Sequence, residues 1–360
     1  MYKVAIAAGG TGGHIFPGIS IAEEFIKEIS ESKILFIGSK NGVENEIIPK
    51  YHFEIKYINA KKLYRYFTFQ NLLFPFYLII SYMQAKRLLR ENDIDIFIGC
   101  GGFVSGAVGF AAKKLDIPIF LQEQNSYPGL STKILAKSSR RIYIGNSEAK
   151  NYFKSLISKV IYTGNPIRKF NMVSKKQALH HWNFEEKRTM FVYGGSQGSH
   201  SVNQNFVEII DELLDKEIQI LFQTGRKEYG KIIDRFQNRE GIVIKPFFDN
   251  IEYAYLASDL VICRAGAISL SEIAHFGLPV IIIPFPYSAG QHQLKNALSY
   301  NRYGAADILT ENELNPKLLL ESILKIIKND TKLKKMSNAI KKLSVSESAK
   351  KIVIDIMSSL

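Results

Sequence analysis

Cysteine and tryptophan are scarce in this 360-residue sequence, which holds two cysteines and one tryptophan. Cys100 and Cys263 each follow an apolar, strand-like run, so two buried free thiols in a reduced compartment are the economical interpretation, with a disulfide as the alternative. A run of about 20 apolar residues, long enough to span a bilayer, is also absent. The apolar stretch at residues 1–8 is too short for a signal peptide. We expect a soluble or peripheral protein.

Acidic residues are in the minority, with 34 Asp and Glu against 47 Lys and Arg, which gives a net charge of +13. This excess favours an anionic partner, such as nucleic acid, anionic lipid or a phosphorylated substrate. No recognised nucleic-acid-binding motif accompanies the charge, so we expect no nucleic-acid partner. The contents of 46% hydrophobic and 22% charged residues are typical of a globular protein.

Short apolar, β-branched runs alternate with helical patterns, which predicts an α/β fold of parallel strands and crossover helices. One series of strands is expected at residues 3–8, 33–37, 53–58, 94–98, 117–121 and 141–144. A second series is expected at residues 189–193, 218–222, 242–245, 260–263, 280–283 and 305–308. Since one core rarely grows beyond about 250–300 residues, we expect two Rossmann-like, doubly wound domains that face each other across a cleft.

The turn-rich residues 163–166 mark the expected domain junction. The prediction is an N-terminal domain of residues 1–163 and a C-terminal domain of residues 164–345. Residues 346–360 are predicted to form a final helix, and its return to the N-terminal domain is left open.

The first expected strand runs into Gly9-Gly10-Thr11-Gly12-Gly13-His14 and then a helical pattern. Glycines let backbone amides approach an anion, and a helix start adds partial positive charge, so this pattern favours a phosphate-binding turn. A turn that serves tight packing alone is the alternative. His14 stands at the carboxyl end of a strand, where doubly wound sheets bind ligands. Because histidine titrates near neutral pH, His14 is a candidate general base, with a helix-capping role as the alternative.

The second domain opens in the same way, with a strand followed by residues 194–199, Gly-Gly-Ser-Gln-Gly-Ser, and a helix expected to run through Asp215. One glycine-rich turn in each domain suits two phosphate-bearing reactants better than it suits a single dinucleotide.

Two later segments of the second domain carry polar groups suited to a nucleotide sugar. Residues 263–272 link a strand to a helix, where Glu272 could accept both hydroxyls of a ribose or simply stabilise the helix N-terminus. Residues 290–297 bring several amide side chains to the start of another helix. Amides suit sugar hydroxyls, although a solvated helix start is the alternative.

We expect no metal site. Asp93 and Asp95 resemble a DxD motif but precede their strand, so they should lie at the end of the sheet away from the ligand. His180 and His181 are adjacent, and adjacent residues on a helix do not share a face.

Residues 61–90 combine basic flanks with many aromatic and aliphatic residues, interrupted by Pro75. This pattern predicts insertion into a membrane interface, although packing in the core would also bury such residues. The expected membrane contacts are Lys61, Lys62, Arg65, Phe67, Phe69, Leu72, Leu73, Phe74 and Phe76.

Six motifs together resemble the MurG family of glycosyltransferase family 28, the GT-B enzymes that act on undecaprenyl-pyrophosphoryl-MurNAc-pentapeptide. They are GGTGGH at 9–14, QEQN at 122–125, GNPIR at 164–168, GGSQGS at 194–199, CRAGAISLSE at 263–272 and QHQLKNA at 291–297. Gln122 stands where the family often has histidine, and Phe248 where it commonly has an aliphatic residue.

The resemblance implies catalytic roles for His14 and Glu123, and an active cleft lined by the substrate-binding residues Thr11, Gly12 and Gly13. Asn125 and Arg168 would lie beside the donor, Ser196 would meet its phosphate, and the backbone near Phe248 its uracil. Phosphate and ribose would meet Ala267, Ile268, Ser269, Leu270, Ser271 and Glu272. Gln293 would meet the GlcNAc hydroxyls.

The implied reaction is the inverting transfer of GlcNAc from UDP-GlcNAc to the C4 hydroxyl of lipid-linked MurNAc-pentapeptide (lipid I), giving lipid II for peptidoglycan. No cofactor is required, and the expected location is the cytoplasmic face of the membrane, as a peripheral protein. Expected partners are the anionic membrane surface and the cell-wall and division machinery. Alternatives are a nucleotide-sugar epimerase, another lipid-directed GT-B transferase, or a membrane-surface scaffold that binds a nucleotide sugar without turnover.

Overall fold

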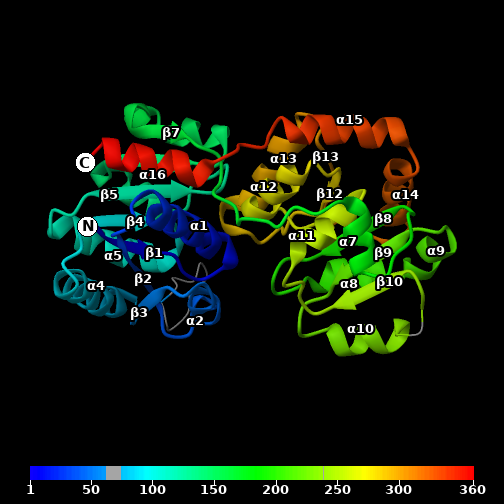
Figure 1. Ribbon diagram of the computed structural model, residues 1–360, viewed down its shortest axis with the longest axis horizontal. Coiled ribbons are helices and arrows are strands. Elements are labelled where there is room, and N and C mark those ends of the chain that lie inside the picture. Colours follow the sequence, from blue (N-terminus) through cyan, green and yellow to red (C-terminus); the bar gives the residue numbers. More distant parts are fainter. Residues whose placement is uncertain (62–73, 238) are drawn as a thin grey trace. The chain divides into compact units, whose positions relative to one another are not determined.

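The computed structural model describes residues 1–61, 74–237 and 239–360 and divides them into two compact units. Unit 1 comprises Met1–Arg168 together with Val345–Leu360, and unit 2 comprises Lys169–Ser344. Each unit is built around one parallel sheet (Figure 1). The prediction of an α/β fold with two Rossmann-like domains is confirmed.

Unit 1 has a seven-stranded sheet in the order β3-β2-β1-β4-β5-β6-β7. Its strands are β1 (Lys3–Ala7), β2 (Lys33–Ser39), β3 (Glu54–Ile58), β4 (Ile96–Gly99), β5 (Ile119–Glu123), β6 (Arg141–Ile144) and β7 (Val160–Tyr162). Its helices are α1 (Gly12–Glu28), α2 (Glu44–Ile47), α4 (Phe74–Glu91), α5 (Gly102–Lys114), α6 (Leu130–Leu135) and α16 (Ser348–Ser358), with short 3₁₀ turns between them.

Unit 2 repeats this order in six strands, β10-β9-β8-β11-β12-β13. Its strands are β8 (Thr189–Tyr193), β9 (Gln219–Gln223), β10 (Ile242–Lys245), β11 (Leu260–Cys263), β12 (Val280–Ile282) and β13 (Ala306–Ile308). Its helices are α7 (Lys175–His181), α8 (His200–Val207), α9 (Ile210–Asp215), α10 (Tyr229–Phe236), α11 (Ile251–Ala257), α12 (Ala267–Phe276), α13 (His292–Asn301), α14 (Pro316–Ile327) and α15 (Asp330–Lys341).

The strands are apolar along their length because helices cover both faces of each sheet. In β1, Ala5 and Ala7 pack into the core beneath α4 and α5, while Val4 and Ile6 pack into the core beneath α1 and α16. In both sheets the strand order reverses at the first strand, between β1 and β4 and between β8 and β11. Such a switch point is where doubly wound sheets bind ligands.

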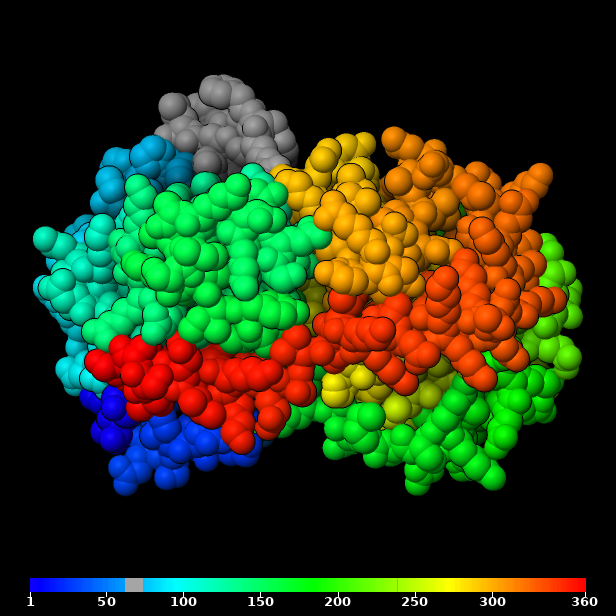
Figure 2. Space-filling model, turned by 90° about the horizontal axis from the view of Figure 1, so that it is seen from above, coloured from blue at the N-terminus to red at the C-terminus, as the bar shows by residue number. Residues whose placement is uncertain are grey.

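Helix α16 is part of unit 1 and lies beside α1 (Figure 1). Its Ile352, Val353 and Ile356 are buried in the same core as Ile6. The hydroxyl of Tyr143 on β6 donates to Asp355 Oδ2 at 2.7 Å. Figure 2 shows the outer face of α16, in red, at the surface of unit 1.

Two elements differ from those expected from the sequence. The helix expected to run through Asp215 breaks after Val207 into α8 and α9, and Ile209 and Ile210 at the break are buried. The short run Val160–Tyr162 adds a seventh strand at the edge of the first sheet. No helix in the described residues is both long enough and apolar enough to cross a membrane.

Candidate active site

The glycine-rich turn of unit 1 joins β1 to α1 at the switch point of the first sheet. Thr11 has extended backbone angles at the N-cap, and its carbonyl accepts from the amides of His14 and Ile15 at 3.0 and 3.2 Å. The amides of Gly12 and Gly13 therefore open the helix without an intrahelical acceptor, as a ligand-binding helix start requires.

A buried carboxylate supports this turn from below. Glu44 is fully buried, and its oxygens accept from the Gly10 amide at 3.1 Å and from the amide and hydroxyl of Ser39 at 2.9 and 2.7 Å. The Gly10 amide therefore already donates to Glu44, and the amides of Gly12 and Gly13 are the ones suited to bind a ligand. Sequence reasoning missed Glu44, since no motif surrounds it.

The imidazole of His14 lies against two glycines that follow β4. Gly101 and Gly102 have φ angles of 92° and 79°, which favour glycine. A Cβ at Gly101 would come within 2.7 Å of His14 Nδ1, and one at Gly102 within 2.4 Å of the Gly9 carbonyl oxygen. Any larger residue at either position would therefore displace the ring or the turn.

A chain of side-chain amides leads from His14 across the carboxyl edge of the sheet. His14 Nδ1 lies 3.1 Å from Gln124 Oε1. Gln124 Nε2 donates to the Cys100 carbonyl at 2.8 Å and to Gln122 Oε1. Gln122 Nε2 in turn donates to Asn165 Oδ1 at 3.2 Å. The QEQN and GNPIR motifs thus meet behind the histidine.

Glu123 is buried and its carboxylate organises the loop that follows β5. Its Oε1 accepts from the amide and the side chain of Asn125 at 3.1 and 3.2 Å, and its Oε2 accepts from the Gly129 amide at 2.9 Å. Glu123 therefore positions Asn125, and no hydrogen bond joins it to His14 in the described structure.

Arg168 lies with its guanidinium 4.3 Å from the ring centre of Phe16 on α1. The neighbouring Ile167 carbonyl accepts from the Ser20 hydroxyl at 2.9 Å. These contacts attach the GNPIR segment to the helix that carries His14.

In unit 2, the glycine-rich turn 194–199 joins β8 to α8 at the second switch point. Ser196 is exposed in this turn. Gln223 supports the turn by donating from Nε2 to the Gly195 carbonyl at 3.0 Å, and its Oε1 accepts from the Phe248 amide at 2.9 Å. The Phe248 side chain is buried against Trp182 and Phe191. Because the Phe248 amide already donates to Gln223, this segment would contact a nucleobase through other backbone groups.

Arg264 is a buried residue of this site to which sequence reasoning gave no role. Its guanidinium donates to the hydroxyls of Ser199 and Ser201 at the start of α8, to the carbonyls of Ile283 and Pro284, and to Glu311 Oε2 at 2.6 Å. Burial alone would raise the pKa of Glu311, but hydrogen bonds from Arg264 and Ser201 and the charge of Arg264 lower it. The serine and glutamate partners of Arg264 are 47 to 65 residues away in the sequence, so local sequence gave no signal for this role.

Helix α12 begins directly after the loop that follows β11. The amides of Ala267, Ile268 and Ser269 occupy its first turn, and the first intrahelical bond runs from the Leu270 amide to the Gly266 carbonyl at 3.0 Å. Those three amides suit an anion or a hydroxyl. The side chains of Ile268 and Leu270 are buried, whereas Ser269 and Ser271 are half-buried.

Glu272 is only 2% exposed, and its Oε2 accepts from the Tyr255 hydroxyl at 3.2 Å. Tyr255 in turn lies 2.9 Å from the hydroxyl of Tyr193 on β8. This tyrosine pair fixes the carboxylate one turn and a half into α12. Gln293 on α13 is held by a hydrogen bond in which its Oε1 accepts from the Phe285 amide at 3.0 Å.

The expected membrane segment is described only in part, since Lys62, Arg65, Phe67, Phe69, Leu72 and Leu73 lie outside the described residues. Lys61 is exposed, Phe74 is half-buried and Phe76 is 72% exposed. Only Ser81, Ala85 and Leu89 of α4 are buried, so much of the apolar surface of this helix faces outward.

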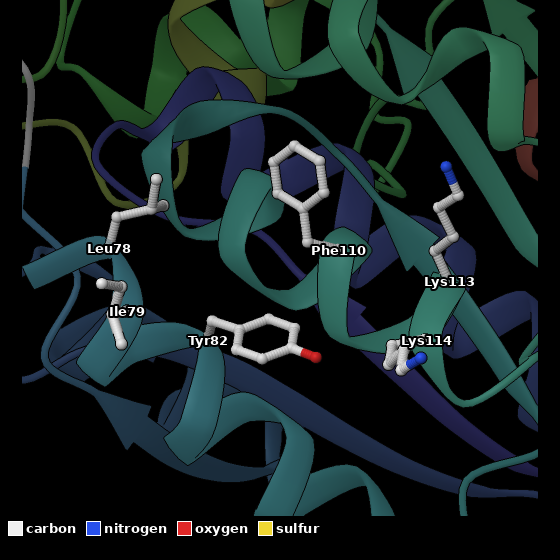
Figure 3. A pocket seen from close by; sticks show the side chains of 6 residues that line it. All are labelled: Leu78, Ile79, Tyr82, Phe110, Lys113 and Lys114. Carbon is white, nitrogen blue, oxygen red and sulfur yellow. The ribbon is translucent and has the colours of Figure 1, made fainter. Parts of the chain in front are cut away.

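Helices α4 and α5 form an apolar pocket flanked by lysines, which we call the α4–α5 pocket. In Figure 3 the aliphatic side chains lie at one end and the two lysines at the other. Its lining residues are Leu78, Ile79, Tyr82, Phe110, Lys113 and Lys114.

The described residues contain no cluster of three or more histidine, cysteine, aspartate or glutamate side chains placed to hold a metal ion. Asp93 and Asp95 bind Lys3 at the amino end of β1, where Asp93 Oδ2 accepts from Lys3 Nζ at 2.9 Å and Asp95 Oδ2 from the Lys3 amide at 2.8 Å.

Family models match both units. Residues 4–144 match the N-terminal domain of glycosyltransferase family 28, and residues 189–352 match its C-terminal domain. A protein of Ruminiclostridium cellulolyticum, named UDP-N-acetylglucosamine–N-acetylmuramyl-(pentapeptide) pyrophosphoryl-undecaprenol N-acetylglucosamine transferase, is 37% identical over 357 residues, covering 97% of this chain and 98% of the relative.

Solved structures share the fold at lower identity. Acinetobacter baumannii MurG superposes with a TM-score of 0.77 at 23% identity, covering 99% of this chain and all of the other. A UDP-GlcNAc 2-epimerase of Neisseria meningitidis gives 0.71 at 15% identity, covering 99% and 100%, so the fold alone does not distinguish transferase from epimerase. The full-length relative distinguishes the two, because it is named as a transferase. The chain belongs to glycosyltransferase family 28, among the MurG-type N-acetylglucosamine transferases.

Proposed function

We propose that this chain transfers GlcNAc from UDP-GlcNAc to the C4 hydroxyl of lipid I, with inversion, and that His14 is the base. The oxygen of the C4 hydroxyl forms a bond to the anomeric carbon while the bond from that carbon to UDP breaks. His14 takes the hydroxyl proton and UDP leaves with the electron pair. The observation that carries the proposal is the imidazole at the switch point, held through Nδ1 by Gln124.

Unit 2 is assigned to the donor. Negative charge grows on UDP as it leaves, and amides at a helix start stabilise such charge without reorganisation. The amides of the Ser196 turn and of Ala267–Ser269 supply these donors, Glu272 accepts from the ribose, and Gln293 donates to the sugar from Nε2. On the acceptor side, Thr11, Gly12 and Gly13 line the site, and Glu123 acts by holding Asn125.

Transfer and epimerisation both occur on this fold, so the test of the proposal measures both products. The decisive assay supplies purified protein with labelled UDP-GlcNAc and a short-chain lipid I analogue, with and without EDTA, beside a sample that lacks acceptor. Labelled disaccharide lipid that forms only with acceptor supports the proposal. Conversion of UDP-GlcNAc without acceptor would instead identify an epimerase, and binding without turnover a scaffold.

We also propose that unit 1 contacts the cytoplasmic membrane surface through α4 and the α4–α5 pocket. Phe76 and Ile79 are 72% and 58% exposed, and burying an exposed apolar side chain contributes about 1.5–3 kcal/mol. Lys61, Lys113 and Lys114 lie near them and favour anionic lipid. Lipid I at that surface, and proteins of cell-wall synthesis and division, are the proposed partners.

Vesicle sedimentation tests this surface. The double variant Phe76→Ser/Ile79→Ser should lose most binding to vesicles rich in phosphatidylglycerol, while Met172→Ser, an equally exposed apolar residue of unit 2, should bind as the parent does. Equal binding by all three proteins would contradict the proposed surface.

A further inference from the structure

The hydrogen bonds of the polar network behind His14 determine which of its ring nitrogens can accept a proton. Neutral histidine has one protonated and one unprotonated ring nitrogen. A hydrogen-bond acceptor next to one ring nitrogen keeps the proton on that nitrogen and leaves the other unprotonated. Only the unprotonated nitrogen can accept a proton from a substrate. The partner of His14 is Gln124, at 3.1 Å from Nδ1.

Two backbone carbonyls fix the direction of this network, because a carbonyl oxygen accepts and never donates. At one end, Asn165 Nδ2 donates to the Gln124 carbonyl at 3.2 Å, which turns Asn165 Oδ1 toward Gln122. Gln122 must then present Nε2 to Asn165 and Oε1 to Gln124. At the other end, Gln124 Nε2 donates to the Cys100 carbonyl at 2.8 Å.

Both constraints place the amide nitrogen of Gln124 on the side away from His14. A flipped Gln124 amide would set its oxygen against the Cys100 carbonyl and against Gln122 Oε1, leaving buried acceptors facing one another, which is costly. Gln122 and Gln124 are buried, so water does not relieve that conflict. Gln124 Oε1 is therefore the atom that faces the ring, and it can only accept.

From this network we infer that Gln124 is a positioning residue that holds neutral His14 as the Nδ1–H tautomer and leaves Nε2 as the basic nitrogen. Gly101 packs beside Nδ1 and Cε1, and the site of a Gly102 Cβ lies 3.5 Å from Cδ2, so the ring is held on those sides. Within the described parts of the chain, Nδ1 is the ring nitrogen that has a hydrogen-bond partner. The inference rests on the proposed role of His14 as base.

The direct test is the tautomer itself, read from long-range proton–nitrogen correlation spectra of the whole protein labelled with 15N-histidine. The sequence has seven histidines, and His14→Gln assigns the resonance. We expect neutral His14 in the wild type to show a protonated Nδ1 and an unprotonated Nε2. A proton on Nε2 in the wild type would overturn the inference.

Removal of the acceptor at residue 124 tests the same point in the spectrum and in the kinetics. Gln124→Met removes the acceptor, so the tautomer preference should be lost. Turnover should fall about 10- to 100-fold, less than the roughly 10²- to 10⁴-fold that general-base catalysis contributes as a whole, and the KM for UDP-GlcNAc should change less than about twofold. Gln177→Met, which removes an amide from α7 of unit 2, should leave both readouts unchanged.

These outcomes separate the inference from the proposed function. If His14→Ala keeps full turnover while the wild-type spectrum shows Nδ1–H, His14 is not the base but Gln124 still sets its tautomer. If Gln124→Met keeps the Nδ1–H tautomer, Gln124 does not select the tautomer and the inference fails.

Discussion

Arg264 and Ser199 are joined by two hydrogen bonds, in which Nε and Nη2 of the guanidinium donate to the same hydroxyl oxygen at 3.0 and 2.7 Å. Because Ser199 is the N-cap of α8, this buried arginine ties the start of the helix to the loop after β11. The two segments proposed to hold the donor phosphates are thus connected through one side chain.

Arg264→Lys should therefore weaken donor binding. Lysine cannot reproduce the planar fork that reaches Ser199, Ser201 and Glu311 together. We expect the KM for UDP-GlcNAc to rise by about tenfold or more, since a lost hydrogen bond to a charged group costs about 1.5–3 kcal/mol. The matched control is Arg235→Lys, at an exposed ion pair with Glu208, which should change KM little. An unchanged KM in Arg264→Lys would remove this residue from the donor site.

Substitutions of His14 and Glu272 should affect different steady-state constants. His14→Ala removes the base, so kcat should fall about 10²- to 10⁴-fold while the KM for UDP-GlcNAc changes little. Glu272→Ala removes a ribose acceptor, so that KM should rise with a smaller change in kcat. The opposite pattern would reverse the two assignments.

Neither cysteine should react with thiol reagents in the folded protein. Both side chains are buried, and burial raises the pKa of Cys100 and of Cys263 to about 12 from the ordinary 9.0. The thiolate fraction at pH 8 is then about a thousandfold lower than for an exposed thiol, because each pKa unit is a factor of ten. Titration with Ellman's reagent should release two equivalents only after denaturant is added, and rapid release from the native protein would contradict the burial.

Helix α16 should stabilise unit 1 through its inner face. Ile352 is fully buried, so Ile352→Ala should lower the free energy of unfolding by about 2–5 kcal/mol. Ile354 on the same helix is 52% exposed, and Ile354→Ala should change stability by no more than about 0.5 kcal/mol. Urea denaturation of both variants measures the difference, and equal losses would mean that α16 does not pack as described.

Local sequence predicted the strands well, because a strand covered on both faces must be apolar along its whole length. The expected bounds of β8, β10 and β11 coincide with those found. The turns after β1 and β8 were also predictable, since glycine, a preceding strand and a following helix are all local signals.

Long-range contacts left no such local signal. Gln124 is 110 residues from His14 in the sequence, and nothing in the QEQN motif alone states which ring it faces. The partners of Arg264 come from three other loops, and Glu44 lies in a short helix without a motif. The amphipathic pattern of α16 predicted a helix but not the surface that covers it.

The return of residues 345–360 to unit 1 also determines the order in which the two units are completed during synthesis. Unit 2 is contiguous, so all of its residues are present before α16 is made, whereas the core of unit 1 lacks Ile352 and Ile356 until 176 further residues, from 169 to 344, have been added. At about 5–20 residues per second this interval is roughly 9–35 s. During that time the apolar side chains of unit 1 that share a core with Ile352 and Ile356 are not covered by α16, so unit 1 completes its core only after unit 2 has been synthesised.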